Sequence, residues 1–338
     1  MQEKISLILA IRNEEKTIKK TLDSIINNEF NKKNYEIIIV DGKSKDKTIE
    51  IVKHFKKKKS NIKLYENPKR IVASGLNIGI KKSKGKIILR LDGHKIYPKK
   101  YISILVDYLN KNPDVGNVGC GIETIIHKNS VIEKCIAEAV SSSFGVGNSK
   151  FRTNKIKSKQ IEDVDTVPFG CFRKELFHKI GFFDEKFIRN QDDEFNLRIK
   201  KFGMRIVLIN SIKVKDFART NFSSLCKMFF GYGYYKPMIW KKHKATSSFR
   251  QLIPLFNIIN LIFCVPIFYI TELKIFLIFM IFYLLFILFF SIKVLIKHKN
   301  FLSFIFSFFA IFIIHNAYAT GNLFMISKMI KENLIFKK

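Results

Sequence analysis

An aspartate, a glycine and a histidine directly follow a short apolar run, and they could bind a metal ion. The run spans residues 86–91 and leads into Asp92, Gly93 and His94. Carboxylate oxygens and imidazole nitrogens are both ligands for divalent cations. If the run is a buried strand, Asp92 and His94 lie at its carboxyl end, where open α/β sheets bind their ligands. We therefore expect a metal or ligand site at this edge of a sheet.

A second acidic group has the spacing expected of a catalytic base. Asp192, Asp193 and Glu194 stand in the first turn of a predicted helix, where acids stabilise the helix dipole, and this explanation suffices for Asp193 and Glu194. Asp192 also shares a stripe with the apolar residues three, seven and ten positions later: Phe195, Ile199 and Phe202. Partial burial would raise the pKa of Asp192 and suit its carboxylate to proton abstraction. Spacing alone leaves both interpretations of Asp192 open.

These groups need a scaffold that brings distant residues together, and the apolar runs predict one. Strands are expected at residues 5–11, 35–40, 62–65, 86–91 and 115–122, with two more at 204–209 and 212–217. Helices are expected between the early strands, one of them over residues 72–82. Strands that alternate with helices indicate an α/β fold with a doubly wound, mostly parallel sheet. Asp41, at the end of the second strand, should then face the same crevice as Asp92.

Three connecting segments carry further candidate residues. Asn13 follows the first strand and is expected to cap the next helix. Gly170 sits in the turn of residues 167–172, where a glycine would let a ligand approach the backbone. Residues 141–159 are rich in Ser, Gly, Asn and Lys, and are expected to form either a mobile loop that closes over a substrate or an ordinary surface loop.

The composition favours a folded chain, and its strong positive charge suggests nucleic-acid binding less than it suggests a general bias in amino-acid usage. The chain has 338 residues, and 47% of them are hydrophobic, which is enough for a sizeable core. The formal charge is +32, but Lys, Ile, Asn and Phe are over-used together, which is typical of a genome-wide bias. The charge favours anionic lipid surfaces and diphosphate substrates, and no nucleic-acid partner is expected. The five cysteines have no metal-ligand spacing and are expected to be buried in a reducing compartment.

The C-terminal third is predicted to attach the chain to a membrane. Apolar stretches cover residues 252–270, 275–292 and 301–326, and each is long enough to cross a bilayer. The aromatic and basic residues 222–240 are expected to lie in the membrane interface, with a packed core helix as the alternative. Because it carries His315 and Asn322 and is followed by lysines, the third stretch is expected to be either a full span or a re-entrant segment.

These features predict the organisation of the whole chain. A catalytic domain is expected over residues 1–220, an interfacial amphipathic segment over 221–250 and transmembrane helices over 251–330. The N-terminus shows no signal-peptide pattern, so the catalytic domain is expected on the cytoplasmic side of the cell membrane, in a multi-pass protein.

Taken together, the motifs resemble those of the family 2 glycosyltransferases, in the membrane-attached branch that builds exopolysaccharides on lipid carriers. The resemblance covers roughly residues 5–240, in the family's order. It implies a GT-A fold, a nucleotide-sugar donor with UDP favoured, and a divalent metal ion, Mg²⁺ or Mn²⁺. By resemblance, the residues that bind the nucleotide-sugar are Ile11, Asn13, Glu14, Asp41, Arg70, Asn77 and Asp92.

The same resemblance assigns the reacting groups. Asp92 and His94 occupy the places of the family's DxD motif and would hold the metal. Residues 191–198, QDDEFNLR, resemble the family's ED motif, with Asp192 at the position of the catalytic base and Gln191 where Glu is usual. The acceptor-side residues implied by the resemblance are Gly170, Cys171, Asp193 and Arg219.

The resulting hypothesis is an inverting glycosyltransferase that moves a sugar from a nucleotide-sugar to a lipid-linked saccharide during cell-surface polysaccharide synthesis. One alternative is a polyprenyl-phosphate sugar synthase, whose acceptor is the lipid phosphate itself. A second is a membrane protein that binds nucleotide or polysaccharide without catalysis. A third, a transport or channel subunit, fits the apolar stretches but not the large set of cytoplasmic motifs. The sequence leaves the sugar, the linkage, the metal and the oligomeric state open.

Overall fold

The chain divides into two compact units. The computed structural model describes residues 4–31, 34–147, 149–153, 160–244, 251–260, 262 and 275–335. One unit contains residues 1–123 and 154–216, and the other contains residues 124–153 and 217–338. The sequence pattern places residues 124–153 in the predicted catalytic domain of residues 1–220, whereas their contacts group them with the C-terminal helices.

The first unit is built on a mixed sheet in which four adjacent strands run parallel. The strands, in chain order, are β1 (Ile5–Ile11), β2 (Tyr35–Asp41), β3 (Ile62–Glu66), β4 (Ile87–Asp92), β5 (Lys95–Ile96), β6 (Val115–Ile125), β7 (Ile161–Asp163), β8 (Cys171–Arg173) and β9 (Arg205–Phe217). Their order in the sheet is β3-β2-β1-β4-β8-β6-β9-β5, and β7 also pairs with β9. Strands β3, β2, β1 and β4 run parallel, whereas β8 pairs antiparallel with both β4 and β6. The predicted α/β class with a mostly parallel sheet is confirmed.

The parallel register explains why two distant aspartates reach one edge. Strands β1 and β2 are apolar and buried along almost their whole length, as strands covered on both faces must be. Ile11 of β1 pairs with Asp41 of β2, and Ala10 of β1 pairs with Asp92 of β4. With neighbouring strands about 4.8 Å apart, the two aspartates flank the end of β1 at a backbone separation of about 10 Å.

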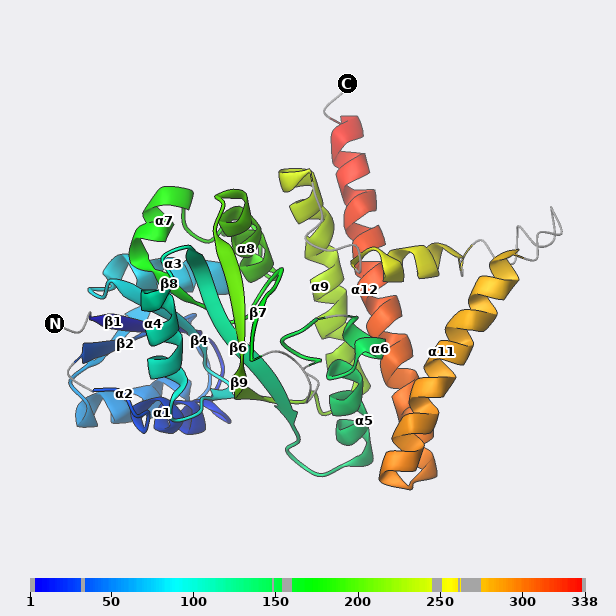
Figure 1. Ribbon diagram of the computed structural model, residues 1–338, viewed down its shortest axis with the longest axis horizontal. Coiled ribbons are helices and arrows are strands. Elements are labelled where there is room, and N and C mark those ends of the chain that lie inside the picture. Colours follow the sequence, from blue (N-terminus) through cyan, green and yellow to red (C-terminus); the bar gives the residue numbers. More distant parts are fainter. Residues whose placement is uncertain are drawn as a thin grey trace. The chain divides into compact units, whose positions relative to one another are not determined.

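Helices cover both faces of this sheet. They are α1 (Ile18–Ile26), α2 (Thr48–Lys58), α3 (Val72–Lys82), α4 (Tyr101–Lys111), α7 (Lys174–Ile180) and α8 (Gln191–Lys201). Figure 1 shows α3 and α7 on one side of β1 and β2, with α1 and α2 on the other. Helix α3 packs closely because Gly79 has no side chain, since a Cβ there would overlap with Ile8.

Two local expectations are wrong. The strands predicted at residues 204–209 and 212–217 form the single long strand β9. Helix α1 begins at Ile18 with Thr17 as its N-cap, so Asn13 does not cap it. Asn13 instead adopts a φ of 54°, a left-handed conformation that asparagine tolerates better than most residues.

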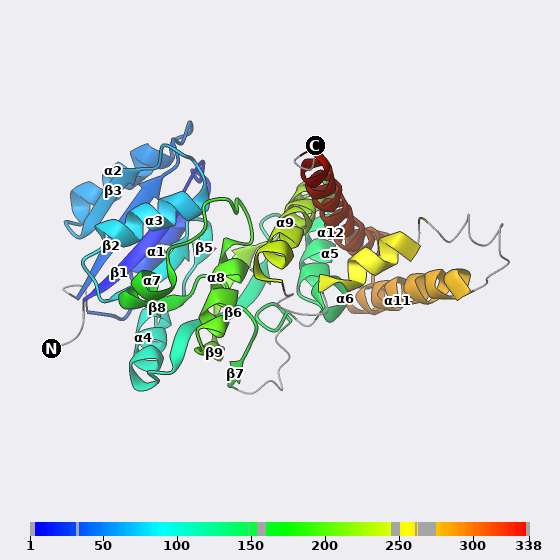
Figure 2. The same cartoon turned by 90° about the horizontal axis from the view of Figure 1, so that it is seen from above.

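The second unit is helical and packs around its C-terminal helix. Its helices include α5 (Val131–Val140), α6 (Ser143–Val146), α9 (Phe222–His243), α11 (Ile275–His298) and α12 (Phe301–Ile335). Helices α5, α9 and α11 all pack against α12, and Figure 2 shows this grouping from above. Helices α9 and α12 can approach closely because Gly233 has no side chain. A Cβ at this position would overlap with the carbonyl group of Tyr318. Gly233 therefore serves helix packing, and a role of residues 222–240 in a membrane interface stays a prediction.

Two helices of the second unit are long and apolar enough to cross a membrane. The most apolar 18 consecutive residues within Leu277–His298 and within Phe301–Glu332 have mean hydropathies of 2.6 and 1.8, and most of these residues are not buried. Helix α12 is continuous over its 35 residues, and whether it spans a membrane fully or is re-entrant stays a prediction. Its His315 and Asn322 face packed neighbours, since His315 bonds to Tyr283 and to the carbonyl of Phe144 and Asn322 is fully buried. Of the stretch predicted at 252–270, residues 253–260 are helical and 263–270 lie outside the described residues.

The cysteines and the predicted mobile loop are described only in part. Cys120, Cys135 and Cys171 are buried and unpaired, as expected, whereas Cys226 is exposed. Cys264 lies outside the described residues. Within the predicted loop of 141–159, residues 143–146 form α6. Residues 148 and 154–159 of this loop lie outside the described residues.

Candidate active site

A buried arginine joins the two aspartates that the sequence singled out. Arg90 lies on β4, and its side chain is 7% exposed. Its Nη2 is 3.0 Å from Oδ1 of Asp92, and its Nη1 is 3.1 Å from Oδ2 of Asp192. Asp92 ends the same strand, whereas Asp192 lies in the first turn of α8, a hundred residues further along the chain. The fold therefore brings the predicted metal-binding acid and the predicted base to one guanidinium group.

The environment of Asp192 suits a proton acceptor near neutral pH. Burial raises the pKa of its carboxyl to about 6, although a quarter (24%) of the side chain remains exposed. Arg90 opposes this rise, while the negative charges of Asp92 and Asp193 add to it. A carboxylate with such a pKa is ionised at pH 7 and still accepts a proton readily. The raised pKa agrees with the prediction from spacing.

The stripe that led to this prediction is correct in part. Phe195 and Ile199 are fully buried beside the sheet, but Phe202 is 50% exposed and lies beyond the end of α8. Glu194 is also more than a dipole partner, since it is fully buried and forms an ion pair with Arg198 four residues later. A buried carboxylate requires such a partner.

Asp92 and His94 have the chemistry of a partial metal site. Burial alone would raise the pKa of Asp92, but Arg90, His94 and Lys95 hold it below its ordinary value. Nδ1 of His94 lies 2.9 Å from Oε1 of Glu14, so a proton on Nδ1 would leave Nε2 with the lone pair that binds metals. Among the described residues, no cluster of three or more His, Cys, Asp or Glu side chains could hold a metal ion. Asp92 and His94 are two residue types that bind divalent cations, and a metal site formed by them stays a prediction.

The predicted nucleotide-binding loops after β1 and β2 are bonded to each other. The backbone N–H of Asn13 donates to Ser44 Oγ over 2.9 Å, and Asn13 Oδ1 accepts from the backbone N–H of Lys45 over 2.9 Å. Asp41 accepts bonds from the hydroxyl and the backbone N–H of Ser44. Ile11 is buried, and its carbonyl accepts from the backbone N–H of Gly42. The loops thus form one rigid rim next to Glu14 and His94.

The third predicted nucleotide segment lies at the start of α3. Arg70 is exposed and has a left-handed φ of 61°. Asn77 is 6% exposed, and its amide group bonds to the backbone N–H and carbonyl of Phe183 and to Glu185. These bonds give Asn77 a structural task in joining α3 to the segment before α8, and its contact with a nucleotide stays a prediction.

The predicted acceptor-side residues have different surroundings. Gly170 follows Phe169, and its carbonyl accepts from the backbone N–H of Arg90. Its φ of 40° and the closeness of Asn117 require glycine there, so a ligand is not needed to explain it. Cys171 is fully buried, and burial raises the pKa of its thiol far above the ordinary range.

Two further acceptor-side predictions lie apart in the chain. Asp193 accepts a 2.8 Å hydrogen bond from Thr166 Oγ1. Arg219 belongs to the second unit, where its Nε donates to the sulfur of Met228. Roles for both in acceptor binding stay predictions.

Arg90 and Phe169 are the site residues that the sequence interpretation missed. The guanidinium of Arg90 lies 5.7 Å from the centre of the Phe169 ring, and so does the ammonium of Lys95, which also pairs with Asp216. A signal existed for Arg90, since a charged residue inside an apolar strand needs an acid partner. Asp92 is two residues away and therefore on the same face of the strand.

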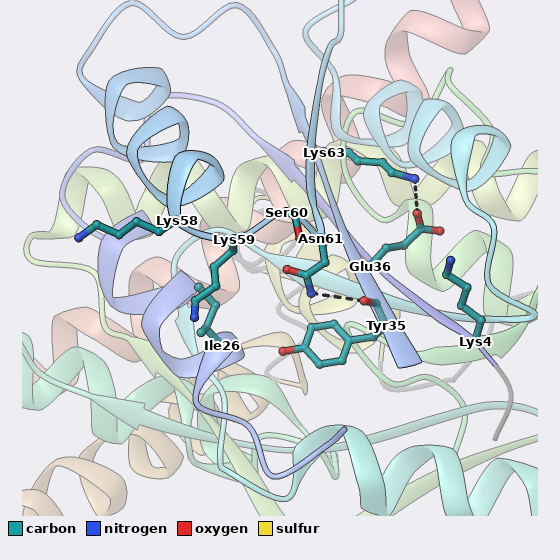
Figure 3. A pocket seen from close by; sticks show the side chains of 9 residues that line it. All are labelled: Lys4, Ile26, Tyr35, Glu36, Lys58, Lys59, Ser60, Asn61 and Lys63. Atoms are coloured by element: carbon teal, nitrogen blue, oxygen red, sulfur yellow. Dashed lines mark hydrogen bonds and ion pairs between the residues drawn. The ribbon is translucent and has the colours of Figure 1, made fainter. Parts of the chain in front are cut away.

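The pocket drawn in Figure 3 lies at the other end of the strands. Its volume is about 490 Å³, and it is lined by Lys4, Ile26, Tyr35, Glu36, Lys58, Lys59, Ser60, Asn61 and Lys63. Tyr35 is the first residue of β2, whereas Asp41 is the last. Figure 3 shows Lys63 paired with Glu36, while Lys58 extends away from both Glu36 and Tyr35. This pocket is thus separate from the aspartates and contains no convergent set of reactive groups.

Known proteins with similar sequences are glycosyltransferases or take part in polysaccharide synthesis. The chain is 33% identical over 246 residues to a dolichyl N-acetyl-alpha-D-glucosaminyl phosphate 3-beta-D-2,3-diacetamido-2,3-dideoxy-beta-D-glucuronosyltransferase of Methanococcus voltae, a match that covers 70% of this chain and 74% of that protein. It is 30% identical over 225 residues to the succinoglycan biosynthesis protein ExoA of Rhizobium meliloti, covering 66% of each chain.

Solved structures and a family model agree with these sequences. The mannosyltransferase PcManGT from Pyrobaculum calidifontis, solved with GDP-Man and Mn²⁺, superposes with a TM-score of 0.53 at 17% identity, over 71% of this chain and 65% of its own. This likeness supports the GT-A fold. The family model described as glycosyl transferase family 2 matches residues 6–181, which include β1 to β4 with Asp41 and Asp92 at their ends. With this match and the relative of Methanococcus voltae, the chain belongs to glycosyl transferase family 2.

Proposed function

We propose that the protein is an inverting glycosyltransferase that transfers a sugar from a nucleotide-sugar, with a UDP-sugar favoured, to a lipid-linked saccharide at a membrane. The observation that carries the proposal is the pairing of Asp92 and Asp192 through Arg90. In this proposal Arg90 holds both Asp92, the donor-binding acid, and Asp192, a proton acceptor with a pKa of about 6.

Asp192 acts as the general base in this mechanism. Its carboxylate takes the proton from an acceptor hydroxyl, and the acceptor oxygen forms a bond with the anomeric carbon of the sugar. The bond from that carbon to the diphosphate oxygen breaks at the same time, and the nucleoside diphosphate leaves with the electron pair. A single displacement inverts the configuration at the anomeric carbon. No nucleophilic side chain is required.

Asp92 and His94 hold the diphosphate end of the donor. A divalent cation bound there would neutralise the charge that develops on the leaving group. Glu14 orients His94 through Nδ1, and the rim of residues 11–14 and 41–48 lies beside it for the nucleoside. The supporting likeness is the structure of a mannosyltransferase that contains GDP-Man and Mn²⁺.

The acceptor is proposed to be a saccharide on a lipid carrier. The name of the Methanococcus voltae relative describes a sugar on dolichyl phosphate, and that of the Rhizobium meliloti relative describes succinoglycan biosynthesis. Helices α11 and α12 are long and apolar enough to hold the catalytic unit at a bilayer. Such attachment raises the effective concentration of the enzyme toward an acceptor in the same membrane. We place the catalytic unit in the cytoplasm and the chain in the cell membrane as a multi-pass protein.

Transfer of radiolabelled sugar into membrane lipids tests the proposal. Membranes that contain the full chain would be incubated with UDP-, GDP- and dTDP-sugars, with and without EDTA, beside Asp192→Asn. The expected result is label in the lipid fraction from one donor, lost with EDTA and in the variant. A product that is a single sugar on lipid phosphate, released by mild acid, would indicate a polyprenyl-phosphate sugar synthase. Nucleotide binding without label from any donor would contradict the proposal.

A further inference from the structure

Arg90 contacts three parts of the site that come from different regions of the chain. Its two terminal nitrogens bind Asp92 and Asp192 over 3.0 and 3.1 Å. Its backbone N–H donates to the carbonyl of Gly170 over 3.0 Å, and its guanidinium lies over the ring of Phe169. Strand β4, helix α8 and the turn before β8 therefore meet at this residue.

Within the described part of the chain, one nitrogen of the Arg90 side chain is left without a hydrogen bond. Its Nε is buried and has no hydrogen-bond partner among the described residues. An unsatisfied buried N–H is unfavourable, so the position of the guanidinium is set by the two carboxylates and not by its own full hydrogen bonding. Phe169 has a φ of 64°, an unusual conformation for a bulky residue, and this turn brings its ring to the guanidinium.

We propose that Arg90 is a positioning residue that fixes the carboxylate of Asp192 relative to Asp92, so that the base and the donor-binding acid keep one geometry. The inference rests on the proposed function, because it takes Asp192 as the base and Asp92 as the donor-binding acid. Arg90 itself touches neither the donor nor the acceptor in this proposal. It acts by holding one oxygen of each carboxylate, which leaves the other oxygen of each for the substrates.

The planar guanidinium is the feature that this task requires. Two terminal nitrogens in a rigid fork reach two acids at once, whereas a lysine ammonium is a compact charge on a flexible stem. Arg90→Lys therefore keeps the positive charge but loses one of the two contacts. Arg90→Met keeps the apolar stem and loses both contacts and the charge. The two variants separate the effect of charge from the effect of geometry.

The test measures transfer by both variants over a pH range, with the labelled-sugar assay on full-length protein in membranes. Arg90→Lys is expected to lower kcat about tenfold with the KM for the donor within about threefold of the native value, because misplacement of a base affects the chemical step. Arg90→Met is expected to lower kcat about a hundredfold. It should also move the acidic limb of kcat/KM to higher pH, since Arg90 is the group that lowers the pKa of Asp192 while Asp92 and Asp193 raise it.

Arg173→Lys is the matched control. Arg173 is also an arginine on a strand of this sheet, but among the described residues its guanidinium donates to the backbone carbonyls of Leu109, Asn112 and Val115 and to no carboxylate. Its substitution is expected to lower thermal stability and leave the pH of the acidic limb unchanged. Binding of UDP with Mn²⁺, measured for every variant, shows whether each has folded.

The outcomes distinguish this inference from the proposed function. If the native protein transfers sugar and Arg90→Lys matches it in kcat while Arg90→Met keeps the acidic limb in place, the inference is overturned and the proposed function stands. If both variants fail only by raising the KM for the donor, Arg90 is a donor-binding residue and the inference is overturned. Native protein that transfers no sugar would overturn the proposed function, and this inference with it.

Discussion

The two ends of the parallel strands differ in how their charged side chains are held. At the carboxyl end, Arg90 holds both Asp92 and Asp192, and His94 is bonded to Glu14. At the amino end, four lysines line the pocket of Figure 3. Strand β2 joins these ends, and its seven residues separate them by about 20 Å.

The comparison teaches that a buried cation shared by two acids, and not the open space, marks the site. Asp92 and Asp192 are both held by Arg90, and their pKa values differ from the ordinary value in opposite directions, lowered for Asp92 and raised for Asp192. At the amino end, Lys63 neutralises Glu36, and Lys58 is exposed. In a chain with 60 Lys and Arg residues, a lysine-lined hollow is an expected feature of the surface.

The largest effect is expected from Asp192→Asn. The amide keeps the shape of the side chain but cannot accept the acceptor proton, so kcat should fall about a thousandfold, within the range of general-base catalysis. UDP binding with Mn²⁺ should stay within about threefold, because Asp192 does not contact the donor in the proposal. Labelled-sugar transfer and titration of nucleotide binding measure the two quantities. Asp107→Asn, which changes an exposed acid of α4, is the matched control.

If Asp192→Asn kept full transfer activity, the carboxyl end of the strands would no longer be distinguished from the amino end by a catalytic base. The carboxyl end would then hold acids without a proton acceptor among them. The assignment of the base would have to move to another group.

A smaller effect is expected from Asp92→Asn. The amide oxygen is a weaker metal ligand than a carboxylate. Loss of a group that only orients a metal ligand typically costs about 10- to 100-fold, so transfer should fall about a hundredfold when a direct ligand is weakened. More Mn²⁺ should be needed for half-maximal activity, which a metal titration of transfer measures. The same titration of His94→Ala should shift in the same direction, because both side chains are proposed to hold one ion. Unchanged metal dependence in both variants would contradict the metal site.

The pH dependence should show a change of about tenfold. Transfer requires ionised Asp192, and its pKa is raised to about 6. Activity should therefore be nearly full at pH 7 and fall as the pH drops through 6, reaching about a tenth at pH 5. A pH profile of kcat/KM measures this limb. Asp193→Asn should move the limb to lower pH, because the negative charge of Asp193 raises the pKa of Asp192. A native limb near pH 4 would show that Asp192 is not the titrating base.

Much of this arrangement could be predicted from local patterns. Apolar runs located β1 to β4, and the parallel fold then placed Asp41 and Asp92 at one edge. The strand predictions succeeded because burial on both faces of a parallel sheet leaves a strong signal in a single stretch of sequence. The helical period singled out Asp192, which contacts the buried Arg90, but it did not reveal that Glu194 is fully buried.

Other features depend on contacts between distant segments, which no local pattern contains. The bond from Arg90 to Asp192 joins residues about a hundred positions apart, and Asn77 is bonded to Phe183 in the same way. Gly170 suggested a ligand, but Asn117 and the positive φ explain it. Residues 124–153 lie between stretches of the first unit in sequence yet pack with the second unit. Their grouping could not be inferred without the tertiary structure.

The smallest effect is expected at the amino end of the strands. Lys58→Gln and Lys59→Gln together remove two positive charges from the pocket of Figure 3, about 20 Å from Asp41 along β2. At this distance, interactions of surface charges are screened in 0.15 M salt, where the Debye length is about 8 Å. Transfer and UDP binding should therefore change less than about twofold. The labelled-sugar assay at 0.15 M salt measures the change in transfer. Arg90→Lys, a single substitution at the carboxyl end that keeps the charge, is measured beside the double lysine variant. A tenfold loss in the double lysine variant would show that the amino end takes part in transfer. The arginine shared by two acids would then no longer distinguish the site from the other end of the sheet.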